Sequence, residues 1–237
     1  MFRIEAMSIN QKLVQVKDLT MGFEKRPLFN NLNLTIEQGD FLSIIGPNGT
    51  GKSTLLHIIM KKLTPKSGKV EYVGSNFGPS KISFVPQTRN ISENYPLNIF
   101  SFVGLRLFNN LIPWLTKSDK QKVSEAIEKV RLTDKSDNLL ASSSGGEQQR
   151  AYIAQALVNN PEMIILDEPT NGLDERSKDE VMEILKLLQT KDNVTIVLVT
   201  HDPESVKNNS TKILMLNGDS TYSVGDQTLL EDANVKF

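Results

Sequence analysis

The chain lacks cysteine and has few histidines, and these absences exclude several kinds of site before any motif is considered. With no cysteine in 237 residues, disulfide bonds and thiolate metal centres are impossible, which suits a reducing compartment. Two histidines leave too few soft ligands for an ordinary transition-metal centre. We therefore expect no soft-metal site built by this chain.

Strong charge and long apolar runs are also missing. Lysine and arginine number 27 against 28 aspartates and glutamates, so the net charge is −1 and no global basic field attracts nucleic acid or an acidic membrane. No apolar run in the sequence reaches the roughly 18 residues that a transmembrane helix needs. We expect a chain with no nucleic-acid partner that is soluble by itself and reaches a membrane through another protein.

A glycine-rich motif of the phosphate-loop type, G-x-x-x-x-G-K-[ST], is present: Gly46, Pro47, Asn48, Gly49, Thr50, Gly51, Lys52 and Ser53. Its glycines let successive backbone N–H groups turn toward a phosphate. The flanking patterns predict a strand over Phe41–Ile45 and a helix over Thr54–Met60, whose N-terminus would face the anion. Lys52 is expected to neutralise the β and γ phosphates, and the Ser53 hydroxyl to bind Mg2+. A ligand-free strand-to-helix turn is the alternative.

Two acidic residues and a histidine follow predicted strands of a parallel sheet. Residues 163–166 and 194–199 are buried-strand runs, and the helix between them has one apolar face, made of Val181, Ile184, Leu185 and Leu188. Asp167 and Glu168 close the first strand and His201 follows the second, so all three are expected at the sheet edge where ligands bind. Asp167 would orient Mg2+ through its water shell, Glu168 would position or deprotonate the attacking water, and His201 would hydrogen-bond the γ-phosphate. Solvated loop acids are the alternative.

The rest of the chain divides into a β-rich opening, a helical insert and a closing hairpin. Strand patterns occur over residues 13–16, 32–36, 69–73 and 81–85. Between Pro96 and Arg131 the pattern becomes helical, with Ser118 as the expected N-cap and one apolar face, made of Val123, Ala126, Ile127 and Val130. Asn217-Gly218 predicts a hairpin leading to a strand near residues 221–224.

A second anion-binding helix start is predicted at Ser144, Gly145 and Gly146. These residues precede the helical run Arg150–Val158, so their N–H groups and the positive end of the helix can face an anion. Because the chain already has a phosphate loop, we expect each nucleotide to be held between two subunits. One subunit would supply the phosphate loop and the other Ser144–Gly146, so that nucleotide joins a head-to-tail dimer.

The motifs together resemble those of ATP-binding cassette (ABC) nucleotide-binding subunits, and the match covers nearly the whole chain. The family order is kept: a Walker A motif at 46–53, a Q-loop at 84–87, a signature at 143–147, a Walker B motif ending at 167–168, a D-loop at 171–174 and a switch histidine at 201. The resemblance implies an α/β fold with a P-loop NTPase core, a mixed and mainly parallel sheet, an N-terminal antiparallel β subdomain and a helical signature subdomain. Residues 1–237 would form a single nucleotide-binding domain, with the core over about 10–90 and 160–237 and the helical subdomain over about 91–159.

The resemblance also implies ATP and Mg2+ as cofactors and assigns further roles. Gln87 would sense Mg2+ and the attacking water, Asp174 would communicate across the dimer, and Phe23 would stack on adenine, although a core phenylalanine is the alternative. Nucleotide contacts would come from the Walker A residues and Thr54 of one subunit and, in the other, from Ser144, Gly145, Gly146 and Glu147.

The signature departs from the usual Leu-Ser-Gly-Gly-Gln of the family at two positions. Here Ser143 replaces the apolar residue and Glu147 replaces the glutamine. The carboxylate is favoured by the helix dipole and disfavoured by a γ-phosphate. Because glutamate also occurs in functional members, the resemblance still implies an active ATPase.

Within the family, residues 94–103 are similar to the corresponding stretch of zinc and manganese import ATPases. The resemblance implies a transporter ATPase, most simply an importer of metal ions or another small solute, peripheral on the cytoplasmic face of the cell membrane. Its partners would be a membrane permease, a second copy of the chain and, indirectly, an extracellular solute-binding protein. The alternatives are a non-transport ABC-class ATPase acting on nucleic acid or protein, and a nucleotide-binding regulator without hydrolysis.

An aromatic cluster in the helical insert, Phe100, Phe102, Phe108 and Trp114, suggests where the permease docks. Aromatic residues are enriched at protein interfaces, so part of this cluster is expected to form a groove for a short permease helix. The alternative is that the cluster packs the helical subdomain internally.

Overall fold

The computed structural model describes residues 11–23, 26–74, 76–87, 96–108 and 114–232. Its central sheet has six strands in the order β5-β6-β7-β3-β8-β9. The strands are β3 (Phe41–Ile45), β5 (Ile82–Val85), β6 (Met163–Asp167), β7 (Thr195–Val199), β8 (Lys212–Leu216) and β9 (Tyr222–Gly225). The first five run parallel, and β9 is antiparallel to β8. The predicted parallel sheet and the hairpin at Asn217-Gly218 are both confirmed.

Burial explains why these short apolar runs form the middle of the sheet. Every residue of β3, β6 and β7 is buried, as parallel strands covered on both faces require. One face packs on helix α1 (Lys52–Ile59), whose residues 55, 56, 58 and 59 are buried. The opposite face packs on α5 (Glu175–Asp192) through its predicted apolar face at residues 181, 184, 185 and 188.

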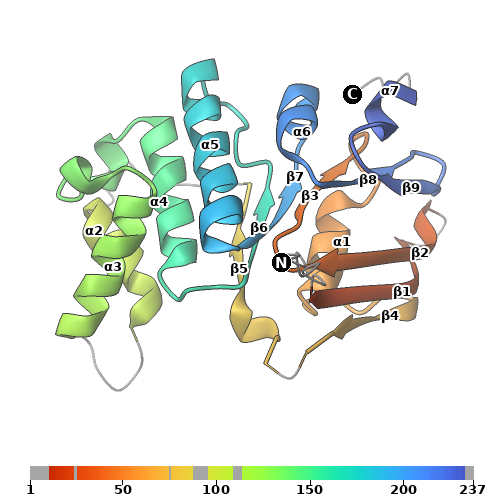
Figure 1. Cartoon of the computed structure of the whole chain (residues 1–237), viewed down its shortest axis with the longest axis horizontal. Coiled ribbons are helices and arrows are strands. Elements are labelled where there is room, and N and C mark those ends of the chain that lie inside the picture. Colours follow the sequence, from red (N-terminus) through yellow and green to blue (C-terminus); the bar gives the residue numbers. More distant parts are fainter. Residues whose placement is uncertain (1–10, 24–25, 75, 88–95, 109–113, 233–237) are drawn as a thin grey trace, which may run out of the picture.

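A three-stranded antiparallel sheet forms the N-terminal part, with strand order β2-β1-β4. Its strands are β1 (Lys12–Phe23), β2 (Arg26–Glu37) and β4 (Ser67–Tyr72). They extend well beyond the windows 13–16 and 32–36, because polar and exposed positions continue the β1–β2 ladder outside the apolar pattern. Helix α1 shares one apolar core with this sheet and the central one, so it lies between them (Figure 1).

The helical part lies at the other end of the molecule (Figure 1). It contains α2 (Ile99–Gly104), α3 (Lys117–Lys129) and α4 (Gly145–Leu157), with 3-10 turns at 105–107, 133–135 and 140–142 between them, while a further 3-10 turn at 79–81 precedes β5. Its apolar residues share a core with α5 and with Ile164 and Leu166 of β6. Two short helices, α6 (Pro203–Asn209) and α7 (Leu229–Asp232), complete the described chain.

Two predicted helix starts need correction. The N-cap of α3 is Thr116 and not Ser118, because the Thr116 hydroxyl accepts the Asp119 N–H at 3.2 Å while the Asp119 carboxylate accepts the Thr116 N–H at 3.0 Å. Helix α1 begins at Lys52, two residues before Thr54. In each case the first turn is polar or glycine-rich, so hydrophobic periodicity places the start too late.

The proposed division into core and helical subdomain stays a prediction, and its boundary near residue 91 lies outside the described residues. Across the described ranges, none of the helices is long and apolar enough to cross a membrane.

Candidate functional site

Four neighbouring strands bring the predicted motifs to one edge of the central sheet. Strands β5, β6, β7 and β3 are adjacent, and their register pairs Val85 with Leu166, and Asp167 and Ile44 each with Val199. Their carboxyl ends therefore lie side by side. The chain leaves these ends into Gln87, Glu168, His201 and the phosphate loop, as expected for a ligand site in a parallel α/β sheet.

The phosphate loop follows β3 in a conformation that requires glycine. Gly46 has φ 143°, and a Cβ there would lie 2.2 Å from the Leu216 carbonyl oxygen. Gly51, at φ 100°, is the N-cap of α1, and the first intrahelical bond runs from the Leu55 N–H to the Gly51 carbonyl. The N–H groups of residues 52–54 precede that bond, so they are available to an anion at the helix start.

A cavity of about 810 Å3 opens over this loop. It is lined by the phosphate-loop residues other than Thr50, and also by Thr54, Gln87, Glu168 and His201. Thr50 is buried and donates to the Pro47 carbonyl oxygen at 3.0 Å, so it supports the loop from behind. The predicted nucleotide residues of the sheet edge are thus brought together around one concave space.

Lys52 places an ammonium group in the cavity beside the phosphate loop. Its Nζ donates to the carbonyl oxygens of Gly46 at 2.7 Å and Pro47 at 3.1 Å. Burial lowers the pKa of Lys52 below its ordinary value, and the nearby carboxylates of Glu168 and Asp167 act in the opposite direction. The ammonium therefore stands between the phosphate loop and the acids that end β6.

Glu168 is the centre of a polar cluster at the mouth of the cavity. Its Oε2 accepts Gln87 Nε2 at 2.8 Å and Asn171 Nδ2 at 3.2 Å, and lies 3.8 Å from His201 Nδ1. Glu168 has φ 47°, a conformation that costs a non-glycine residue about 1–3 kcal/mol. Its N–H donates to the Val199 carbonyl at 2.9 Å, which ties the strained residue to β7.

The residues expected to bind Mg2+ supply oxygen ligands at the same edge. Ser53 is exposed to the cavity, and Asp167 is the buried last residue of β6. Within the described ranges, no group of three His, Cys, Asp or Glu side chains could hold a metal ion. Mg2+ usually combines one or two protein oxygens with phosphate oxygens, so a hydroxyl and a carboxylate beside a phosphate loop fit it.

Phe23 lies at the rim of the cavity and is 55% exposed, so the alternative of a core phenylalanine is wrong. Two further residues, Arg26 and Leu28, line the same rim and were not predicted from the sequence. The Arg26 guanidinium lies against Gly49 of the phosphate loop. Arg26 lies beside Phe23 because the two residues pair across the β1–β2 ladder. Both lie outside the strand windows that the sequence indicated.

Asn171 is the third lining residue that the sequence reasoning missed as a site residue. It follows Glu168 by three residues, and its N–H donates to the Glu168 carbonyl at 3.2 Å. The resulting turn brings its side chain back onto the carboxylate. Its place in the turn directly after the Walker B strand is the feature of the sequence that could have identified Asn171 as a site residue.

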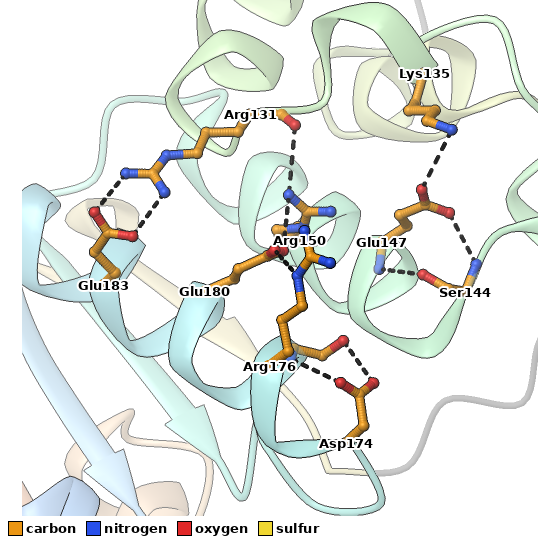
Figure 2. Close-up of polar contacts among 10 residues, drawn as sticks. Arg131, Lys135, Ser144, Glu147, Arg150, Asp174, Arg176, Glu180 and Glu183 are labelled. Atoms are coloured by element: carbon orange, nitrogen blue, oxygen red, sulfur yellow. Dashed lines mark hydrogen bonds and ion pairs between the residues drawn. The ribbon is translucent and has the colours of Figure 1, made fainter.

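The signature residues and Asp174 do not line this cavity. Ser144 is the N-cap of α4, and a capping box joins it to Glu147: the Glu147 N–H donates to Ser144 Oγ at 3.3 Å, and Glu147 Oε2 accepts the Ser144 N–H at 2.9 Å. Lys135 Nζ lies 3.8 Å from the other oxygen of Glu147 (Figure 2). The carboxylate is therefore folded back onto its own helix start.

The capping box determines which groups at this helix start remain for an anion. The Gln148 N–H makes the first intrahelical bond, to the Ser144 carbonyl at 2.9 Å, and the Glu147 N–H is taken by Ser144. Within the described part of the chain, the N–H groups of Gly145 and Gly146 and the hydroxyl hydrogen of Ser144 are not used in capping; Ser144 and Gly145 are exposed, whereas Gly146 is buried. Asp174 begins α5 in a similar way, as its carboxylate accepts the Ser177 N–H at 3.0 Å and the Ser177 hydroxyl at 2.7 Å.

A phosphate loop facing a polar cluster of glutamate, glutamine and histidine, on a parallel sheet, defines a P-loop nucleoside triphosphatase. The ABC transporter family profile matches residues 29–171, more than half of the chain. The chain therefore belongs to the ABC transporter family and is an ATP-hydrolysing subunit that binds ATP with Mg2+.

Similar proteins agree with this assignment. The zinc import ATP-binding protein ZnuC of Pasteurella multocida is 32% identical over 89% of this chain and 75% of the relative. The zinc transport system ATP-binding protein TroB of Treponema pallidum is 34% identical over 86% of this chain and 78% of the relative. A solved dimeric ATP-binding cassette in a post-hydrolysis state, bound to ADP and Pi, is 30% identical, with a TM-score of 0.75 over 91% of this chain and 99% of that one. The alternative of a non-transport ATPase is not favoured by these likenesses.

The capping box predicts how replacement of Glu147 affects stability. Glu147→Gln should keep the acceptor for the Ser144 N–H and leave the free energy of unfolding nearly unchanged, whereas Glu147→Ala should lower it by about 0.5–2 kcal/mol. Urea unfolding of the three proteins measures the difference. Equal losses in both variants would mean that the Lys135 charge contact, and not the capping hydrogen bond, is what Glu147 contributes.

Proposed function

We propose that the chain powers a zinc importer by hydrolysing ATP at the cavity over its phosphate loop. The observation that carries the catalytic part is the Glu168 carboxylate, held by Gln87 and Asn171 at the carboxyl edge of β6. The cargo is suggested by ZnuC and TroB, whose names state zinc import and zinc transport, at 32% and 34% identity over most of the chain. Manganese is the second candidate, because residues 96–103, together with 94 and 95 outside the described residues, are similar to the corresponding stretch of manganese as well as zinc import ATPases. Another small solute is the third.

In this proposal each residue of the cavity has a distinct task. Lys52 neutralises the β and γ phosphates, and Ser53 and Asp167 hold Mg2+, which offsets phosphate charge when bound. Glu168 orients or deprotonates the attacking water, with Gln87 and His201 contacting the water and the γ-phosphate. Phe23 stacks on adenine through its exposed ring.

The second half of the site would come from a second copy of the chain. Ser144, Gly145 and Gly146 lie outside the cavity of their own chain yet have donors at a helix start that the capping box does not use, which fits a γ-phosphate held by another subunit. Asp174, at the start of the neighbouring helix, would contact that subunit. The dimer would bind a membrane permease at the cytoplasmic face, and an extracellular solute-binding protein would deliver the cargo.

The role of Glu168 predicts separate effects on hydrolysis and on binding. Glu168→Gln should lower kcat at least about 100-fold, because the general base is lost, while ATP binding survives and the dimer persists with ATP. Steady-state ATPase assays and sedimentation with Mg-ATP measure the two effects. Asp219→Asn, at an exposed carboxylate in the β8–β9 turn, is the matched control and should keep normal turnover.

The cargo is tested by uptake in cells. Deletion of the gene in its own host should lower uptake of radioactive zinc at limiting concentration, and the wild-type chain should restore it, whereas Glu168→Gln should not. Manganese and iron uptake are measured in the same strains. A deficit confined to manganese would transfer the proposal to the second cargo, and normal uptake of all three would reject metal import.

Docking of the permease is expected to use part of the predicted aromatic cluster. Phe102 is 6% exposed and packs edge-to-face on Tyr152 at 4.9 Å, so for this residue the internal alternative is correct. Phe108 and Trp114 are 42% and 68% exposed, and Phe100 is half-buried against the helical core. Phe108 and Trp114 are therefore the candidates for contact with a permease helix.

Substitution of these two residues should separate transport from hydrolysis. Phe108→Ser with Trp114→Ser should lower zinc uptake at least about fivefold, because aromatic anchors carry a large part of interface energy, while the ATPase activity of the isolated chain stays normal. Val224→Ser, at an exposed position of β9, is the control. Full uptake by the double variant would remove this surface from the docking site.

A further inference from the structure

Helices α4 and α5 meet along a polar line that starts at the signature and the D-loop. Asp174, the N-cap of α5, is followed at intervals of three by Ser177, Glu180 and Glu183, so each is a surface neighbour of the next in a row that winds around the helix. Opposite them, Gly146 and Arg150 are four residues apart on α4, so they share a side. Figure 2 shows this line, with Arg131 at its far end.

The first contact along the line is a close approach at the signature itself. A Cβ on Gly146 would lie 2.6 Å from Ser177 Oγ and 2.8 Å from Ser177 Cβ, and one on Gly145 would lie 3.2 Å from Leu173 Cδ2. The signature glycines therefore rest directly on the turn that Asp174 caps. A shift of α4 against α5 would move these N–H groups relative to Asp174.

The second contact is an ion pair in a shielded position. Arg150 Nη1 lies 3.5 Å from Glu180 Oε2 and donates to the Arg131 carbonyl at 3.4 Å, and the Arg150 side chain is only 13% exposed. The other oxygen of Glu180 accepts Arg176 Nε at 3.3 Å. Glu180 is thus the carboxylate that α5 offers to the guanidinium of the signature helix.

The third contact, between Arg131 and Glu183, has shorter hydrogen bonds than the second but is more exposed to solvent. Arg131 donates to both oxygens of Glu183 at 2.7 Å, a bidentate geometry that lowers the pKa of Glu183 and raises that of Arg131. Its side chains are 46% and 56% exposed. Water screens such a pair, so the shielded Arg150–Glu180 pair should constrain the helices more despite its longer distance.

We propose that Glu180 and Arg150 are positioning residues that hold the start of α4 on α5, so that Ser144–Gly146 and Asp174 are presented to a second subunit as one unit. The Arg150–Glu180 pair lies one turn of α4 beyond the contact of Gly146 with Ser177. Two contacts one turn apart fix the tilt of the α4 start relative to α5. Neither residue lines the cavity, so the chain's own nucleotide contacts do not involve them. The inference rests on the proposed function, because it concerns the half-site offered to another copy.

The experiment measures dimer formation and nucleotide binding separately in the full chain carrying Glu168→Gln. In this background, Glu180→Gln is expected to raise the dissociation constant of the Mg-ATP dimer roughly tenfold in sedimentation, a coupling of the size measured between contacting residues. Affinity for a fluorescent ATP analogue, measured at concentrations where the chain is monomeric, should stay within about twofold. Arg150→Met should behave alike, and the double variant should lose no more than the worse single variant.

Two control variants isolate the pair. Glu183→Gln removes the same charge from the exposed contact one step further along α5, and Arg176→Gln removes the other partner of Glu180. Both should leave the dimer constant within about twofold.

Four outcomes would overturn the inference. These are an unchanged dimer constant in Glu180→Gln, an equal loss in Glu183→Gln, additive losses in the double variant, or a parallel fall in nucleotide affinity and Tm, which marks a purely structural role. If the Glu168→Gln parent itself does not dimerise with ATP, the proposed composite site fails together with this inference. If the Glu168→Gln parent dimerises and the added Glu180→Gln substitution has no effect on the dimer, the inference is rejected and the proposed composite site stands.

Discussion

The parallel register of four adjacent strands is the constraint on which the rest of the structure depends. Strands β5, β6, β7 and β3 are hydrogen-bonded neighbours whose carboxyl ends lie at one edge, so residues separated by more than a hundred positions in sequence meet there. Gln87 and Glu168 are bonded across 81 residues at 2.8 Å only because β5 pairs with β6 in this direction. An antiparallel β6 would send its acids to the opposite edge. Burial enforces the direction, since β3, β6 and β7 are apolar at nearly every position and need helices on both faces.

Sequence patterns were sufficient for this central part because each motif sits directly after an apolar run. Asp167 ends β6 and His201 follows β7 by two residues, so identifying the strands is equivalent to locating the acids and the histidine. The phosphate loop likewise joins a predicted strand and a predicted helix. Because βαβ connections make successive strands parallel, a residue that follows an apolar strand run can be assigned to the carboxyl edge of the sheet from the sequence.

The features that sequence reasoning missed are set by side chains acting on the backbone. Helix α3 begins before the predicted N-cap at Ser118, because a Thr116–Asp119 capping box starts it in polar sequence, whereas the predicted helix start at Ser144–Gly146 agrees with the structure. Arg26 and Leu28 were missed because their place at the cavity depends on the register of β1 with β2, whose irregular ladder has several shifts. The exposure of Phe23 could not be read from its type either. Cross-strand register and burial are long-range properties, and a single sequence encodes them only through the complete packing of the core.

The two helix starts for which we propose anion binding, those of α1 and α4, differ in the residues that form them. Helix α1 has Gly51, which has no side chain, as its N-cap, and Lys52, its first residue, adds an ammonium group. Helix α4 begins at a serine whose hydroxyl is held by the Glu147 N–H, so its hydrogen is free to donate, and the glutamate that replaces the usual glutamine accepts the Ser144 N–H. A carboxylate occupied in this way, with Lys135 near its second oxygen, directs its charge into the helix start instead of toward an incoming phosphate. The departure at Glu147 is therefore compatible with anion binding at Gly145 and Gly146, because the carboxylate accepts the Ser144 N–H and leaves the two glycine N–H groups out of the capping box.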